Sequence, residues 1–415
     1  MKAWEIKKIG EVCTLKSGTT VNKNLERASG DIPYLKVADM TLPENNPEIF
    51  TSSRFLSQES LRESSIFPIG TTIFPKRGGA ILTNKKRLTA VSICADLNIM
   101  GVVPSKFLLP KFLYFHFLNI DMRKLGSGSS IPQINNYDIE PLIISFPSLL
   151  EQKRIVSIVD QAFEGIDRAI ANTKKNLTNA RELFESYLNA IFTQKGDGWI
   201  EKQLQDVCLY ITDGKHGDCR NEDNSGYFFL SAKDVKQDRL NYEGARQITK
   251  EDFEETHRRT KLEPGDVLIT NSGTIGRTAI VPEDERTCKT TFQKSVAILK
   301  PIREQINSDF CRYSLMAHLN EIVGISAGTA QKNLLLRDIR AHRFHMPKTV
   351  HEQEIIAAKL DEFCRESQRL ETIYRQKLAA LTELKQSILQ KAFTGELTAD
   401  IANQTTKKAE EAIAA

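Results

Sequence analysis

The chain has 415 residues, which is too long for a single hydrophobic core, and domain-size arithmetic predicts two or three folding units. Its hydrophobic fraction of 40% and its 57 basic against 53 acidic side chains exclude a largely disordered or strongly basic protein. The seven cysteines are dispersed, and no stretch approaches the roughly 20 apolar residues of a membrane span. We therefore expect a cytoplasmic protein with reduced thiols and no membrane contact.

The first predicted folding unit covers residues 1–147. Short β-type runs, interrupted by Gly, Pro and Asn, precede a single apolar helix. Because strands and helices are mixed without a regular βαβ alternation, the pattern favours an α+β fold. The predicted strands lie at residues 32–37, 71–74 and 89–94, and the predicted helix lies at 112–125.

A long heptad segment follows at residues 148–195. Its apolar side chains recur at alternating steps of three and four over many turns, which indicates a coiled-coil seam. A helix of about 42 residues would be roughly 60 Å long at 1.5 Å per residue. The seam residues that we expect to pack against a partner helix include Ile155, Ile166, Leu177 and Phe184.

The second predicted unit, residues 196–347, repeats the first. The copies open with Ala-Trp-x-x-x-x-Ile-x-x-Val-Cys and Gly-Trp-x-x-x-x-Leu-x-x-Val-Cys, so that Trp4 returns as Trp199 at a shift of 195 residues. We therefore expect two related globular domains. The predicted strands of the second copy lie at 227–230, 266–270, 278–281 and 295–299, and the helix lies at 309–323. Other matched pairs are Asp39 with Asp234, Gly70 with Gly265, Pro147 with Pro347, and Gln152 with Gln353.

A second heptad segment occupies residues 348–397, and we expect the tail at 398–415 to be disordered. Two matching seams in one chain are natural partners, and the domain between them allows an antiparallel arrangement. The expected architecture is two pseudo-twofold-related α/β globular domains separated by two long helices in an antiparallel coiled coil. The alternative, in which each helix packs on its own globular domain, stays open. The seam residues here include Leu360, Leu370, Leu381 and Ile388.

No string in the chain completes a catalytic motif. His351 and Glu352 begin like a zinc-binding helix, but Ile355 stands where the second histidine is required. The stretch 273–278 lacks the Lys-Ser/Thr pair of a P-loop, and residues 31–34 lack the first proline of an amino-methyltransferase signature. We therefore expect a chain that is not an enzyme and that carries no cofactor or metal ion.

Glycine-containing loops recur at equivalent places in the two copies and suit contacts with double-stranded DNA. Arginine and lysine make bidentate contacts with guanine, asparagine does so with adenine, and glycine permits close approach to a phosphate. Each loop alone also fits an ordinary solvated turn, so the interpretation depends on the recurrence. The candidates in the first copy are Lys76, Arg77, Gly78, Lys85, Lys86, Arg87, Ser127, Ser129 and Gln133. The candidates in the second copy are Lys215, His216, Asn271, Ser272, Thr274, Arg277, Thr329, Gln331, Lys332 and Asn333.

In this order and in duplicate, these strings resemble the specificity subunit of type I restriction–modification systems over essentially the whole chain. The resemblance rests on the duplicated opening, on Ile-Thr-Asp-Gly-Lys-His at 211–216, on the Asn-Ser-Gly-Thr-Ile-Gly-Arg string at 271–277, and on Glu-Gln-x-x-Ile before each helix. It implies two target-recognition domains with the helices as a ruler between them. It also implies two methyltransferase subunits and ATP-driven restriction subunits as partners, which perform the catalysis with S-adenosylmethionine and ATP.

The two copies differ where DNA contacts are expected. The first copy has Lys76 and Arg77 where the second has Asn271 and Ser272, and it lacks the Asp-Gly-x-His string. We therefore expect an asymmetric DNA target in two parts. Two alternatives stay open, namely the DNA-recognition subunit of a combined nuclease–methyltransferase system and a coiled-coil scaffold that binds proteins instead of DNA.

Overall fold

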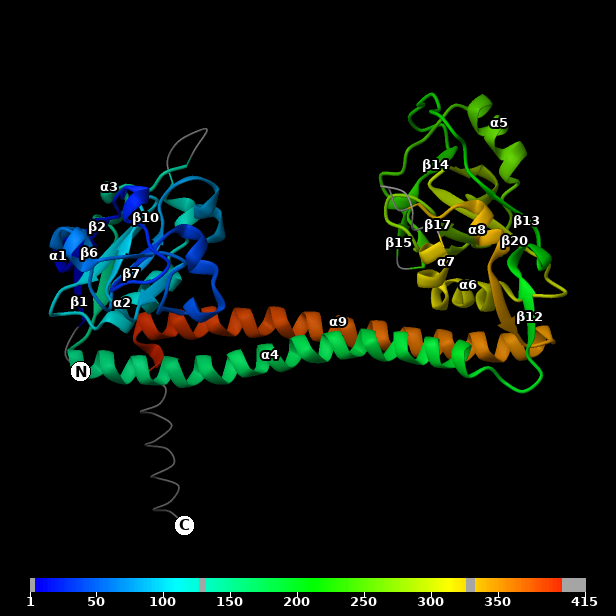
Figure 1. Ribbon diagram of the computed structural model, residues 1–415. Helices are drawn as coiled ribbons and strands as arrows, with labels where there is room; N and C mark the ends of the chain where they lie inside the picture. Colours follow the sequence, from blue (N-terminus) through cyan, green and yellow to red (C-terminus); the bar gives the residue numbers. More distant parts are fainter. Residues whose placement is uncertain (1–3, 127–131, 237, 326–332, 398–415) are drawn as a thin grey trace, which may run out of the picture. The chain divides into compact units, whose positions relative to one another are not determined.

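The computed structural model describes residues 4–126, 132–236, 238–325 and 333–397 (Figure 1). The chain forms two compact units. Unit 1 comprises residues 1–173 and 376–415, and unit 2 comprises residues 174–375. Each unit contains one globular part of mixed strands and helices, together with one stretch of each long helix. The long helices are α4 (Leu149–Gln194) and α9 (Val350–Thr394).

The globular part of unit 1 holds short strands in two sheets and one ribbon. The strands are β1 (Glu5–Lys8), β2 (Cys13–Ser17), β3 (Ile32–Leu35), β4 (Glu48–Ile49), β5 (Phe55–Leu56), β6 (Ile66–Phe67), β7 (Thr72–Pro75), β8 (Arg87–Thr89), β9 (Ile93–Ala95), β10 (Ile99–Pro104) and β11 (Ile143–Phe146). A five-stranded sheet has the order β2-β10-β7-β8-β4, a four-stranded sheet has the order β5-β3-β9-β6, and β1 pairs with β11. The helices are α1 (Ile9–Val12), α2 (Pro110–Asn119) and α3 (Asn136–Ile139).

The predicted elements of unit 1 are found with shifted ends. The runs 32–37 and 71–74 correspond to β3 and β7, whereas the run 89–94 is divided between β8 and β9. The predicted helix begins two residues earlier, with Pro110 in its first turn, where the missing N–H of proline leaves no hydrogen bond unmade. It ends at Asn119 and is followed by a short 3₁₀ turn.

The globular part of unit 2 repeats this plan. Its strands are β12 (Ile200–Gln203), β13 (Cys208–Asp213), β14 (Phe228–Leu230), β15 (Val235–Lys236), β16 (Arg239–Leu240), β17 (Val267–Thr270), β18 (Thr278–Ile280), β19 (Thr290–Phe292), β20 (Val296–Pro301) and β21 (Arg343–Met346). The central sheet has the order β13-β20-β17-β18, and β12 pairs with β21 as β1 does with β11. The helices are α5 (Lys250–Thr260), α6 (Ser308–Ala317), α7 (Leu319–Ile325) and α8 (Leu336–Ala341). The four predicted strands correspond to β14, β17, β18 and β20, the predicted helix is divided into α6 and α7, and α5 was not expected.

The long helices pack on the globular part of each unit through equivalent aromatic side chains. In unit 1 the ring of Phe112 in α2 lies 4.9 Å from the ring of Phe393 in α9. In unit 2 the ring of Phe310 in α6 lies 5.3 Å from the ring of Phe192 in α4. Phe112, Phe192 and Phe310 belong to the core clusters of their units, and Phe393 packs against the cluster of unit 1. Each globular part is therefore covered by the start of the helix that follows it and by the end of the other helix.

The long helices also pair with each other, and the pairing is antiparallel. In unit 2 the Ser367 hydroxyl donates to the carbonyl oxygen of Ala180 at 2.7 Å, and the rings of Phe184 and Phe363 lie 6.4 Å apart. Residue numbers thus rise along α4 as they fall along α9. In Figure 1 the two helices can be followed side by side within each unit. The predicted antiparallel pair is confirmed.

Both arrangements that the sequence left open are therefore present. Ile155 and Leu360 lie in the cores of the globular parts, so these two seam residues hold a helix to its own domain. Leu370 is 38% exposed, which corrects its assignment to the seam. The remaining seam residues are Ile166, which is buried, and Leu177, Phe184, Leu381 and Ile388, which are half-buried.

A buried glutamine fixes the start of each long helix on its globular part. The Gln152 amide oxygen accepts from the backbone N–H of Leu109 at 2.9 Å, and its amide nitrogen donates to the carbonyl oxygens of Phe107 and Pro147, both at 2.9 Å. The three corresponding bonds in unit 2 join Gln353 to Asn307, Gln305 and Pro347. Both glutamines are fully buried. The repeated Glu-Gln string therefore has a structural role, because it holds the helix to the loop that precedes α2 or α6.

Candidate nucleic-acid interface

In unit 1 the loops predicted to bind DNA meet at one end of the five-stranded sheet. β10 pairs antiparallel with both β2 and β7, so β10 begins where the other two strands end. Lys76 directly follows β7, and its ammonium donates to the Ser17 hydroxyl at 2.9 Å. Its backbone N–H donates to the carbonyl oxygen of Asn98 at 2.8 Å. Lys76 is thereby tied to the end of β2 and to the loop before β10.

The segment 132–135 lies against the same end of the sheet. The backbone N–H of Ile134 donates to the carbonyl oxygen of Lys76 at 2.9 Å, and Arg77 forms an isolated antiparallel bridge with Gln133. Gly78 has a φ of +66°, and no atom lies within 4 Å of where a Cβ would stand. The structure thus brings Lys76, Arg77, Gly78 and Gln133 together beside open space. Two further candidates, Ser127 and Ser129, lie outside the described residues.

The basic run at 85–87 has a different role from the one predicted. The Lys86 side chain is 3% exposed, and its ammonium donates to Asn84 Oδ1 at 2.8 Å and to the carbonyl oxygen of Ile120 at 2.6 Å. Burial lowers the pKa of Lys86 to about 8. Arg87 donates to the carbonyl oxygen of Lys86 and is half-buried, as is Lys85. We therefore correct the prediction for Lys86, because its ammonium is bonded within the protein.

Unit 2 has the same arrangement at the corresponding end of its central sheet. The backbone N–H of Asn271, which directly follows β17, donates to the carbonyl oxygen of Ser295 at 3.0 Å. Its carbonyl oxygen accepts from the backbone N–H of Leu334 at 2.8 Å. These are the two bonds that Lys76 makes in unit 1, so Asn271 is its structural counterpart. The predicted residue Asn333 is half-buried and directly precedes Leu334.

The loop after β17 offers several accessible polar groups. Thr274 and Arg277 are exposed, and Ser272 is half-buried. Gly273 has a φ of +75° with nothing within 4 Å of a built Cβ, as found for Gly78. Asn271 is 7% exposed, and its side-chain oxygen has no hydrogen-bond partner in the part of the chain that the structure describes. The remaining candidates of this copy, Thr329, Gln331 and Lys332, lie outside the described residues.

The basic groups of the Asp-Gly-Lys-His string are held by carboxylates. The Lys215 ammonium lies 2.9 Å from Glu255 Oε2, and the hydrogen bond between them raises the pKa of Lys215. His216 Nε2 lies 2.9 Å from Asp213 Oδ2, and Arg259 forms an ion pair with the same carboxylate. Lys215 and His216 therefore lie at the same sheet end, where neighbouring carboxylates bind both side chains.

The glycines of the loops after β2 and β13 serve the protein's own backbone. A Cβ on Gly18 would lie 1.9 Å from the carbonyl oxygen of Asp96, and a Cβ on Gly214 would lie 1.9 Å from that of Phe292. No side chain fits at these distances. The glycines at these two places are thus required for close packing of the loop on the neighbouring strand connection.

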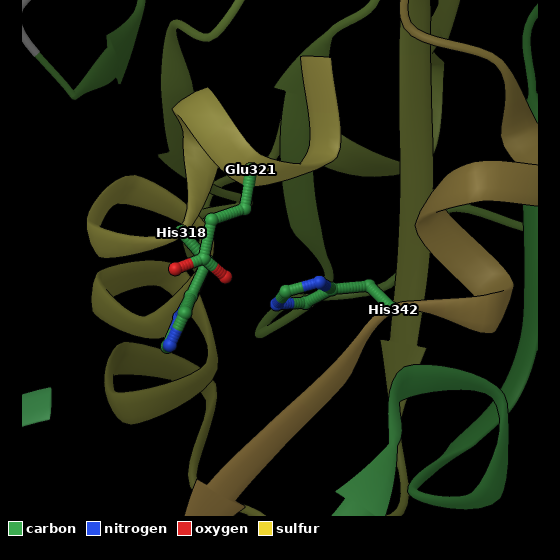
Figure 2. A group of neighbouring side chains, drawn as sticks. All are labelled: His318, Glu321 and His342. Carbon is green, nitrogen blue, oxygen red and sulfur yellow. The ribbon is translucent and has the colours of Figure 1, made fainter. Parts of the chain in front are cut away.

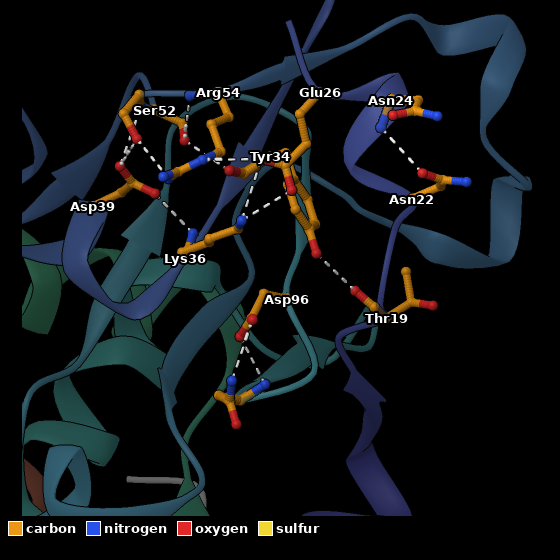
Figure 3. A network of polar contacts seen from close by, with 12 residues as sticks. Thr19, Asn22, Asn24, Glu26, Tyr34, Lys36, Asp39, Ser52, Arg54 and Asp96 are labelled. Atoms are coloured by element: carbon orange, nitrogen blue, oxygen red, sulfur yellow. Dashed lines mark hydrogen bonds and ion pairs between the residues drawn. The ribbon is translucent and has the colours of Figure 1, made fainter.

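A polar network in unit 1 explains another repeated residue (Figure 3). Glu26 forms ion pairs with Lys36 and Arg54, both at 2.9 Å. Its carboxylate therefore partly compensates the positive charge of both side chains. Asp39 Oδ2 accepts from the backbone N–H of Lys36 at 2.8 Å, and Asp234 makes the same bond at 2.8 Å to the residue three places before it. The aspartate shared by the two copies therefore closes a turn and is not a candidate contact.

No pattern in the sequence singles out Asn98 or Ser295. Each residue supplies the carbonyl oxygen that holds Lys76 or Asn271 at the sheet end. Their place depends on pairing between strands that are far apart in the chain, and no local motif marks them. Asn98 directly precedes β10, and Ser295 directly precedes β20. This position would identify both residues once the order of the strands in the sheet is known.

Comparison with known proteins identifies the family. The family model described as the type I restriction modification DNA specificity domain matches residues 1–179 and again residues 196–379. The two matches follow the two copies of the repeat and cover most of the chain. The chain belongs to this family. Members are specificity subunits, which are not catalytic themselves, and the enzymatic activities of these systems reside in partner subunits.

Several curated relatives of this family are similar to the chain. The EcoBI specificity subunit of Escherichia coli is 23% identical over 70% of this chain and 66% of that protein. The MjaIX specificity subunit of Methanocaldococcus jannaschii is 24% identical over 50% of this chain and 52% of that protein. The chain thus spans about half to two thirds of these two relatives. The EcoKI specificity subunit of Escherichia coli is 25% identical over 96% of this chain and 90% of that protein.

Solved structures show the same fold. A chain from work on complex assembly and conformational transition of a type I restriction–modification system aligns with a TM-score of 0.76 and 20% identity, over 96% of this chain and 99% of that one. The HsdS subunit from Thermoanaerobacter tengcongensis aligns with a TM-score of 0.57 and 20% identity, over 95% of this chain and 98% of that one. Among the described residues of this family member, no helix is long and apolar enough to cross a membrane.

Proposed function

We propose that this chain is the DNA-reading subunit of a type I restriction–modification complex and that each unit reads one half of an asymmetric, two-part DNA target. The observation that carries the proposal is the structural equivalence of Lys76 and Asn271. Both follow the same strand of the central sheet and make the same two backbone bonds, yet one is a cation and the other an amide. Equivalent positions with different side chains suit two half-sites of different sequence.

The chemistry of each loop fits this division. In unit 1, Lys76 and Arg77 suit the acceptor atoms on the major-groove edge of guanine. In unit 2, the amide of Asn271 matches the donor and acceptor of adenine, and its buried side-chain oxygen has no hydrogen-bond partner among the described residues. The exposed Thr274 and Arg277 suit phosphate contacts that fix the register on the duplex.

We further propose that α4 and α9 fix the spacing of the half-sites. α4 has 46 residues, and α9 has 45. A continuous helix of such a length resists bending and compression far better than a flexible linker does. Inserting one heptad into each helix, after Lys174 in α4 and after Arg375 in α9, adds roughly 10 Å at 1.5 Å per residue. Both positions lie in the exposed middle stretches of the helices.

The helices also suit the binding of the methyltransferase partners. The apolar side chains that remain accessible on them include Leu183 at 57%, Leu370 at 38%, Ile373 at 45% and Leu384 at 47% exposure. Apolar side chains exposed on a helix are typical of a surface that another helix covers. In the proposed complex, two methyltransferase subunits and the restriction subunits bind S-adenosylmethionine and ATP, and the specificity subunit acts in the cytoplasm.

The test is to map methylated sites in the host genome with and without this gene, and with loop and helix variants. Lys76→Ala combined with Arg77→Ala should change or relax one half-site only, and Asn271→Ala should affect only the other. The heptad insertion should lengthen the spacer by about three base pairs at 3.4 Å per base pair and leave both half-sites unchanged. A contiguous or palindromic site would contradict the proposal. So would a loop variant that alters both halves.

A further inference from the structure

We propose that His318, Glu321 and His342 of unit 2 form a binding site for a divalent transition-metal ion of the Zn²⁺ class. One ligand atom from each residue lies within 4.8 Å of the other two. Figure 2 shows the imidazole of His342 directed towards His318 and Glu321. The inference concerns unit 2 alone and does not depend on the proposed DNA-reading function.

The three residues come from separate elements that converge at one place. His318 follows the last residue of α6, and Glu321 lies three residues later in α7. His342 lies between α8 and β21. His318 Nδ1 lies 2.8 Å from the carbonyl oxygen of Ser314, which can only accept, so Nδ1 carries the hydrogen. Nε2 of His318 therefore has a free lone pair, and a backbone carbonyl holding the other nitrogen is usual for a metal-binding histidine.

His342 supplies the second, independent observation. Its side chain is 5% exposed, and its Nε2 is buried without a hydrogen-bond partner among the described residues. Buried polar atoms are paired in most native structures, so an unpaired imidazole nitrogen requires an explanation. A metal ion between the two imidazoles supplies the missing partner, because it accepts the lone pair of a neutral nitrogen.

The repeat provides an internal comparison. The carbonyl oxygen of His342 accepts from the backbone N–H of Leu204 at 3.0 Å, and that of Leu142 accepts from Ile9 at 2.8 Å in the same way. Leu142 is therefore the counterpart of His342 in unit 1. Asn307 and Leu109 are also counterparts, because their N–H groups bind Gln353 and Gln152. His318 lies eleven residues after Asn307, and Ile120 lies eleven residues after Leu109. Ile120 is therefore the counterpart of His318.

Unit 1 thus has leucine and isoleucine where unit 2 has the two histidines. The residue that corresponds to Glu321 by the same count is Arg123, a cation. Leu142 and Ile120 pack against the core of unit 1, which shows that this position in the fold requires no polar group. Unit 2 has replaced two apolar residues and one cation by three groups that bind metal. A structural need of the fold does not explain this set, whereas a ligand does.

The geometry and the donor set define the ion. Ligand distances of about 2.0–2.1 Å place the donor atoms of a tetrahedral zinc ion about 3.3 Å apart. Glu321 is exposed, so its flexible side chain can move the short distance that closes the site. Two imidazoles and one carboxylate favour Zn²⁺, Co²⁺ or Ni²⁺ over Mg²⁺ or Ca²⁺, and water takes the fourth position. The bound ion would tie α7 to the strand that leads into α9.

The experiment uses the full chain, freed of metal with a chelator and titrated with Zn²⁺ alone. Binding is measured by competition with a chromophoric chelator, and thermal unfolding is followed in a Trp4→Phe background, in which Trp199 of unit 2 is the remaining tryptophan. We expect one ion per chain and a rise of about 5 °C in the melting temperature of unit 2 at saturating metal. The double variant His318→Ile with His342→Leu introduces the residues of unit 1 and should lose both effects.

Two further variants separate this site from unspecific binding. Glu321→Gln changes only an exposed side chain and should weaken Zn²⁺ binding at least tenfold, which keeps the test valid if the double variant does not fold. His351→Ala removes an exposed histidine outside the site and should bind as the wild type does. All variants retain the seven cysteines, so binding by thiols would be equal in all of them. Equal binding in wild type, double variant and Glu321→Gln, or no zinc-dependent change in melting of the wild type, would overturn the proposal.

Discussion

Units 1 and 2 are alike in the contacts that hold the long helices to their globular parts, and they differ in the side chains at their sheet ends. Gln152 and Gln353 make the same three hydrogen bonds, and the aromatic contacts to the long helices recur. At the sheet end, in contrast, unit 1 has the cation Lys76 where unit 2 has the amide Asn271. A duplicated scaffold keeps its architecture where these contacts are kept, and this leaves the loop side chains free to diverge.

The interiors of the units also differ, and the difference is electrostatic. Unit 2 contains a buried ion pair at 3.0 Å between Lys300 and Asp266. Burial raises the pKa of Asp266 to about 6. At a shift of 195 residues from Asp266, unit 1 has Thr71, whose hydroxyl donates to the carbonyl oxygen of Pro68. The polar group at this position is thus bonded by an ion pair in unit 2 and by a neutral hydrogen bond in unit 1. The fold therefore does not require a charge at this position.

The largest effect should come from the buried glutamines. Gln152→Leu leaves the N–H of Leu109 and the carbonyl oxygens of Phe107 and Pro147 without their partner, and we expect it to destabilise unit 1 by about 3 kcal/mol. Urea unfolding in a Trp199→Phe background, which leaves Trp4 to report unit 1, measures this loss.

Gln353→Leu should have an equal effect on unit 2, and the exposed Gln161→Ala should have none. Unequal losses in the two units would show that the repeated bonds are not equivalent in energy, and this would contradict an equal role for the two glutamines.

The second effect concerns acid stability. Burial lowers the pKa of His116 to about 4, and its Nε2 is enclosed without a partner among the described residues. The folded pKa lies below the usual 6.5, so the neutral ring contributes stability above pH 6.5 that is lost as the pH falls towards 4. Because part of the ring is accessible, we expect a loss of roughly 2 kcal/mol over this window.

His116→Leu should remove this pH dependence from unit 1, as measured by urea unfolding at pH 7 and at pH 4. The exposed His351→Leu serves as the control and should follow the wild type. An unchanged acid response in His116→Leu would mean that other groups determine it.

The third effect separates two kinds of basic residue in unit 1. Arg77→Ala should lower the affinity for target DNA about tenfold without changing stability, because Arg77 is exposed at the sheet end. Lys86→Met should lower stability by about 1 kcal/mol and leave DNA affinity unchanged, because its ammonium is bonded inside the protein. Fluorescence anisotropy with labelled duplex and urea unfolding measure the two quantities. The reverse pattern would restore the original prediction for Lys86.

The smallest effect should come from ion pairs on the paired helices. Arg181 lies 2.9 Å from Glu371 in unit 2, and both groups are partly accessible to solvent. Arg181→Ala should therefore cost less than about 1 kcal/mol, and 1 M salt should remove the difference from wild type. A larger loss in the urea midpoint would indicate that charge, and not the apolar seam, holds the helices together.

Sequence alone determined the large features of this protein. The repeat, the two long helices and some of the strands follow from patterns in the sequence, because hydrophobic periodicity is a local property of the chain. The identity of the loops around Lys76 and Asn271 followed from their recurrence in the two copies. The helix α5 was missed, because Phe253 is the only large apolar side chain that it buries, beside Thr256 and Thr260.

Only the tertiary structure decided which of these residues act together. It placed Asn98 and Ser295 beside the candidate loops, enclosed the ammonium of Lys86, and brought His342 to His318 across 24 residues of chain. Such contacts depend on strand order and burial, which arise from long-range pairing that no local pattern encodes. The sequence determines which side chains carry a charge, but the packing around each side chain determines whether that charge is exposed to solvent.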